Sequence, residues 1–87
     1  MITQKQAIEA ATLSEKLFEL IAPELAGKPP EVQSAALADM VAIWLAGNVI
    51  IGDRKATNEL RAELLGNFID VVCKLIPDHE SMFDEVN

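Results

Sequence analysis

The sequence predicts an all-α protein, a bundle of three helices or up to four with a short C-terminal helix, completed by oligomerisation. Its 87 residues are 51% hydrophobic, and Ala and Leu, which favour helices, dominate that set. The aromatic residues that favour strands are limited to three Phe and one Trp. Apolar residues recur at helical spacing between segments rich in Pro and Gly. The length allows one domain, residues 1–87.

The first helix is predicted at about residues 3–22, with Thr3 as a suitable N-cap. Pro23 lacks a backbone donor and is expected to end or kink this helix. The Pro- and Gly-containing residues 23–29 form the predicted connector. The helix is amphipathic, because one side carries a polar stripe at helical spacing: Lys5, Glu9, Thr12, Lys16 and Glu19.

The second helix is predicted at about residues 30–47. Pro30 suits the first helical position, and Glu31 complements the positive helix N-terminus. Gly47 is a candidate for a left-handed C-terminal residue. The apolar residues after it allow two alternatives, an extended turn or a continuation of the helix.

The third helix is predicted at about residues 54–76, with Asp53 as its N-cap and Pro77 as its end. An acidic tail, residues 77–87, follows. Met82, Phe83 and Val86 would share one side of a short helix there, which would let the tail dock. The third helix also has a polar stripe: Glu59, Glu63, Asn67, Asp70 and Lys74.

Residues 35–51 contain a single charged residue, Asp39. A membrane span needs ~20 apolar residues, and a central Asp costs ~3 kcal/mol on insertion. This run is shorter and is interrupted at Gly47 and Asn48. We therefore expect a helix inside a protein assembly and no membrane association.

The second helix lacks the polar stripe that the other two have. A helix that is apolar on all sides is normally surrounded, and two neighbours cannot surround it. We therefore favour a homo-oligomer, most simply a dimer, over a monomeric bundle. The bulky residues would face the first and third helices, and an arc of small residues would contact the partner. The candidate core residues are Leu37, Val41, Trp44, Leu64 and Phe68, and the candidate interface residues are Ala35, Ala38, Asp39, Ala42 and Ala46.

Asp39 borders the small-residue arc, and a buried carboxylate needs a partner or must take up a proton. The simpler expectation is that it lies at the edge of the contact and meets water, Ser34, or an arginine such as Arg54 or Arg61. The alternative is a pair of Asp39 side chains at a two-fold axis that share a proton or a cation.

The net charge of −7 argues against nucleic-acid binding, which needs a basic face. The single cysteine, Cys73, excludes an internal disulfide and fits a reducing cytosol. The N-terminal residues show no apolar signal-peptide region. We expect a cytoplasmic protein.

No motif indicates catalysis. His79 is the only histidine, and its cluster with Asp78, Glu80, Asp84 and Glu85 fits no known metal-ligand spacing. The serines, Ser14, Ser34 and Ser81, lie far in sequence from any convincing catalytic pair, and one tail histidine makes a poor triad. No glycine-rich phosphate loop occurs. We therefore expect a protein that is not an enzyme and has no catalytic residue, cofactor or metal.

The chain is similar to acyl carrier proteins in its size and acidity. Those proteins carry their prosthetic group on the serine of an Asp-Ser-Leu motif at the start of a central helix. Here the nearest tripeptide, Glu80-Ser81-Met82, lies in the tail, and Ser34 follows Gln33. The motif is missing, so we do not expect a carrier.

The sequence therefore favours a protein–protein interaction or regulatory module that acts as a homo-oligomer. The alternative is an acidic protein that binds a basic partner, as a nucleic-acid mimic or an antitoxin does. The charge alone supports this alternative.

Overall fold

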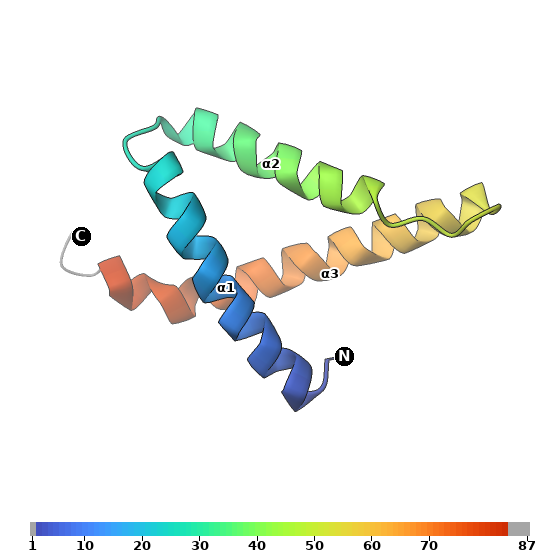
Figure 1. The fold of residues 1–87 in the computed structure, drawn as a ribbon, viewed down its shortest axis with the longest axis horizontal. Helices are drawn as coiled ribbons and strands as arrows, with labels where there is room; N and C mark the ends of the chain where they lie inside the picture. Colours follow the sequence, from blue (N-terminus) through green and yellow to red (C-terminus); the bar gives the residue numbers. More distant parts are fainter. Residues whose placement is uncertain (1, 84–87) are drawn as a thin grey trace. The chain divides into compact units, whose positions relative to one another are not determined.

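The computed structural model describes residues 2–83, and these residues form helices without a strand. The elements are α1 (Gln4–Leu25), α2 (Pro30–Ala46), α3 (Arg54–Glu80) and the short 3₁₀ helix η1 (Ser81–Phe83) (Figure 1). The predicted all-α fold class is thus confirmed. The chain divides into two units, residues 1–37 and 38–87, and the boundary falls inside α2.

α1 begins as predicted, with Thr3 as its N-cap. The Thr3 hydroxyl accepts from the Gln6 backbone N–H at 3.1 Å, and the Gln6 side chain accepts from the Thr3 N–H at 2.9 Å. This reciprocal capping box satisfies two donors that the helix leaves open.

The predicted end of α1 at residue 22 is wrong, because the helix passes through Pro23 and continues to Leu25. Pro23 loses only its own hydrogen bond to the carbonyl one turn earlier. The ladder resumes beyond it, where the Ala26 N–H donates to the Ala22 carbonyl at 3.0 Å. Proline one turn from a helix end removes one bond without stopping the helix.

The connector between α1 and α2 is therefore shorter than predicted and covers residues 26–29. Gly27 adopts a left-handed φ of 77°, which only glycine adopts at no steric cost. The Gln33 side chain then donates to the Leu25 carbonyl at 2.9 Å and ties the start of α2 to the end of α1.

α2 ends at Ala46, and the left-handed conformation predicted for Gly47 is wrong, because the glycines with positive φ are Gly27 and Gly52. The Gly47 N–H instead bonds to the Ile43 carbonyl at 3.1 Å, as in a helix. Asn48 closes the turn, since its side-chain amide donates to the Trp44 carbonyl at 2.8 Å.

The segment between α2 and α3 is the extended alternative rather than a continued helix. A tight turn reverses it, in which the Asp53 N–H donates to the Ile50 carbonyl at 3.1 Å and Gly52 has a φ of 82°. Positive φ at this turn position is typical of a type II turn. Asp53 then caps α3 as predicted, accepting from the Ala56 N–H at 2.9 Å.

α3 does not stop at Pro77 as predicted but continues to Glu80, and η1 follows directly. As at Pro23, one backbone bond is lost and the helix goes on. The first part of the predicted tail is thus helical. Val86, Asp84 and Glu85 lie outside the described residues.

Candidate interaction surface on the α2–α3 hairpin

The second half of α2, the turn and α3 form a helical hairpin, here called the α2–α3 hairpin. Arg61 joins its two helices. Its Nε donates to the carbonyls of Leu45 at 3.0 Å and Asn48 at 3.2 Å, and Nη2 donates to that of Ala46 at 2.8 Å. A cation at a helix C-terminus also complements the negative end of the helix dipole.

These bonds complete the C-terminus of α2. A helix leaves its last four carbonyls without partners inside the helix. Here Gly47 and Asn48 donate to three of them, the carbonyls of Ile43, Trp44 and Leu45. Arg61 donates to the fourth, the Ala46 carbonyl, and also to that of Leu45. No carbonyl of this last turn is left unpaired, so the end of α2 is held firmly against α3.

Thr57, on the first turns of α3, holds the preceding segment. Its hydroxyl accepts from the Ile50 N–H at 2.9 Å and donates to the Asp53 carbonyl at 2.9 Å, with the Ile50 carbonyl at 3.2 Å. Thr57 is only 4% exposed. The turn is therefore fixed by a buried hydroxyl as well as by the Asp53 cap.

Trp44 of α2 meets Phe68 of α3, with ring centroids 5.8 Å apart and the planes tilted by 47°. Such pairs stabilise by about 0.5–1.5 kcal/mol beyond area burial. Both rings nevertheless stay 43% and 39% exposed. The other candidate core residues are half-buried (Val41 and Leu64) or exposed (Leu37), so their role as a closed core stays a prediction.

Among residues 2–83 no hydrophobic side chain is buried. In the hairpin this leaves Ile43 66% exposed on α2, and Leu65, Ile69 and Ile76 exposed on α3. Monomeric soluble proteins rarely expose contiguous apolar patches larger than a few hundred Å². The hairpin therefore carries apolar surface that its own two helices do not cover.

The candidate interface residues of α2 are all exposed: Ala35, Ala38, Asp39, Ala42 and Ala46. Asp39 is exposed in the single chain, which fits both expectations for it, so both stay predictions. Arg61 is not its partner, because its guanidinium group bonds to the far end of α2.

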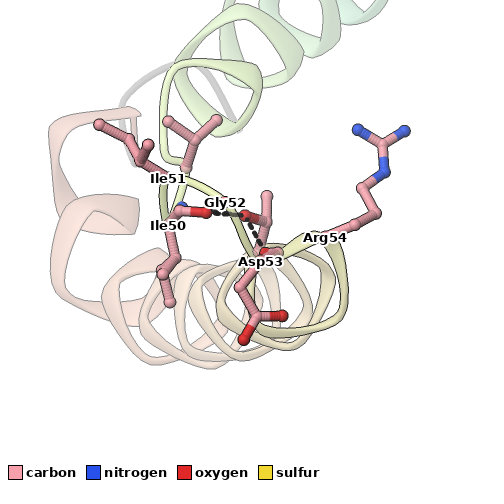
Figure 2. Close-up of a pocket in the computed structure, with 7 residues that line it drawn as sticks. Ile50, Ile51, Gly52, Asp53 and Arg54 are labelled. Carbon is pink, nitrogen blue, oxygen red and sulfur yellow. Dashed lines mark hydrogen bonds between the residues drawn. The ribbon is translucent and has the colours of Figure 1, made fainter.

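The turn itself projects apolar side chains. Ile51 is 94% exposed, and Figure 2 shows Ile50 and Ile51 pointing in different directions from the turn while Arg54 extends away from it. An open hollow of about 390 Å³ lies here, lined by residues 49–54 and Thr57. It is too open to enclose a small ligand.

Models of known protein families, characterised proteins and solved structures gave no match to this chain. Among the helices of residues 2–83, none combines the length and the apolar composition that a membrane crossing requires. Within residues 2–83 no three His, Cys, Asp or Glu side chains gather as a metal site would require.

Sequence reasoning missed Arg61 and Thr57, the two residues that organise the hairpin. A signal was present, because both are polar yet lie outside the polar stripe of α3, four residues apart and beside Leu60 and Leu64. A polar residue on the apolar side of a helix often bonds to backbone at a neighbouring chain reversal.

Proposed function

We propose that this protein is a non-enzymatic protein–protein interaction module of the cytosol that acts as a homo-oligomer, most simply a dimer. The observation that carries the proposal is the exposure of α2. Beyond Glu31 its only charged residue is Asp39, and yet Ala38, Ala42, Ile43 and Ala46 are exposed.

The apolar sides of α2 need neighbours to cover them. α3 contacts the C-terminal part of α2, where Trp44 meets Phe68 and Arg61 bonds to the helix end. One further amphipathic helix would cover at most one further side. Because α2 has no polar side to leave in water, a third neighbour is needed, and a second copy of the same helix supplies it.

Sedimentation of the purified chain tests this proposal. The wild type is expected at about twice the 9.5 kDa chain mass. Ala42→Lys would place a charge in the contact, which is strongly unfavourable without a partner, and should weaken association by roughly tenfold or more. The control Asn67→Lys makes the same change in charge on the polar stripe of α3 and should leave the mass unchanged. A wild type that sediments as a monomer at all concentrations overturns the proposal.

Salt separates this proposal from binding through the acidic surface. Two chains of charge −7 repel each other, so apolar association should tighten as salt rises. Binding of a basic partner would instead weaken with salt.

A further inference from the structure

α3 carries two apolar stripes on different sides. The side that faces α2 holds Thr57, Leu60, Arg61, Leu64 and Phe68, which we call the inner stripe. A second set of residues is exposed and repeats at spacings of three and four. This outer stripe consists of Ala62, Leu65, Ile69, Val72 and Ile76.

The angle between the two stripes matches the angle between the two neighbours of a helix in a four-helix bundle. At 100° per residue, the outer stripe lies about 100° around α3 from the inner stripe, and the polar stripe lies on the remaining side. In a four-helix bundle each helix has two neighbours about a quarter turn apart. α3 therefore has the surface of a bundle helix with one neighbour, α2, in place and the second absent from its own hairpin.

The exposed alanines of α2 lie on the same side of the hairpin as the outer stripe. The side of α2 that faces α3 is centred on Val41, Trp44 and Leu45. The chain reverses between the helices (Figure 1), so, viewed from one end of the hairpin, successive residues turn clockwise around one helix and anticlockwise around the other. Ala38 and Ala42 lie about a quarter turn around α2 from the side that faces α3. Because the two helices turn in opposite senses, this quarter turn brings the alanines to the same side of the hairpin as the outer stripe of α3.

The outer stripe can pair with its own copy in an antiparallel direction. Leu65 and Ile69 lie two residues on either side of Asn67, and Ala62 and Val72 lie five residues on either side. A two-fold axis at the level of Asn67 would therefore bring Leu65 against Ile69 and Ala62 against Val72, a small residue against a larger one. Spacings of three and four are those of helices that pack side by side.

Charge supports the same register. α3 begins with Arg54 and Lys55 and ends with Asp78 and Glu80. Cations at a helix N-terminus oppose the helix dipole, so within one chain this placement is locally unfavourable. Arg54 and Glu80 lie thirteen residues on either side of Asn67, so antiparallel pairing would bring opposite charges together at both ends.

We propose that two α2–α3 hairpins form an antiparallel four-helix bundle. In this bundle α3 packs against α3 of the mate about a two-fold axis at the level of Asn67, and the exposed alanines of α2 pack against those of the mate's α2. This inference rests on the proposed function and adds the pairing surface and its register. A second copy is the occupant because both the spacing and the charges of α3 are self-complementary in this register.

Disulfide trapping tests the register in the full chain with Cys73→Ser as background. Ala62→Cys and Val72→Cys are prepared as separate chains and are also mixed by unfolding and refolding together. In the proposed register a residue 62 faces residue 72 of the mate, whereas two copies of residue 62 are ~15 Å apart along the axis. A disulfide needs Cα atoms within ~7 Å. The expected result is a disulfide dimer in the mixture, at least tenfold above either chain alone.

Each other result overturns the inference. Disulfides within each chain type alone would indicate parallel α3 helices. A dimer by sedimentation without any disulfide would place the contact elsewhere and leave the proposed function standing. A monomer would remove both. Circular dichroism and sedimentation of each reduced variant against wild type establish that folding is intact.

Discussion

Arg61 ties the C-terminus of α2 to α3. It makes three bonds to carbonyls from residues 13 to 16 positions earlier in the chain. Hydrogen bonds that involve a charged group stabilise more than neutral ones, and the half-buried position limits competition from water.

Arg61→Ala should therefore lower the free energy of unfolding by about 1.5–3 kcal/mol, because the end of α2 loses its tie to α3. Urea denaturation at fixed protein concentration measures this. The matched control is Lys74→Ala, which removes one positive charge from the exposed polar stripe of the same helix and should change stability by less than ~0.5 kcal/mol. Equal losses in the two variants would contradict a structural role for Arg61.

Roles that depend on neighbours in the sequence could be predicted, and roles that depend on distant parts of the chain could not. The predictions for Thr3 and Asp53 succeeded, because an N-cap bonds to backbone three residues ahead and is thus local. The role of Arg61 depends on where a helix end fifteen residues away lies, which only the folded chain determines. The predicted contact side of α2 is exposed as an interface requires, but its role stays a prediction.

At the scale of the elements, helix starts were predicted better than helix ends. Pro30 and the two N-caps identify starts because they favour one backbone geometry. The prolines at 23 and 77 did not end their helices, since each removes only one bond. Gly47 failed as a left-handed residue because Asn48 and Arg61 already bond to the carbonyls that such a cap would serve.

Substitution by Ala at Gly52 and at Gly66 should change the free energy of unfolding in opposite directions. Neither has an atom within 4 Å of an added Cβ, so steric crowding plays no part at either. Gly52→Ala would strain a residue with φ of 82° and should lower the free energy of unfolding by about 1 kcal/mol. Gly66→Ala lies inside α3 and should raise it by up to ~1 kcal/mol.

Paired urea denaturation curves measure both changes, and each variant serves as the control for the other. A loss of stability at Gly66 as well would mean that its surface is covered closely in the assembled protein. A gain at Gly52 would contradict the left-handed geometry of the turn.

At the scale of the whole molecule, assembly and stability should be linked. A small chain with little buried apolar surface gains much of its stability from a partner, so mass action should raise Tm with concentration. For a dimer of 87-residue chains, roughly 0.7 kcal/mol of unfolding enthalpy per residue gives a rise of about 4 °C per tenfold in concentration.

Differential scanning calorimetry over a hundredfold range of protein concentration measures this rise. Ala42→Lys should lower Tm and reduce the rise over the same range, whereas Asn67→Lys should match the wild type. A Tm independent of concentration in the wild type would show that one chain completes its own fold.

The ties within the hairpin also bear on how quickly it forms. Thr57 reaches a residue seven positions away, and Arg61 reaches sixteen at most. Closing a loop of about ten residues takes ~10–100 ns, and short sequence separations favour fast folding. Chain reversal between the two helices is then no kinetic obstacle. The slow step of folding should be the meeting of two chains, with a rate that depends on how much protein is present.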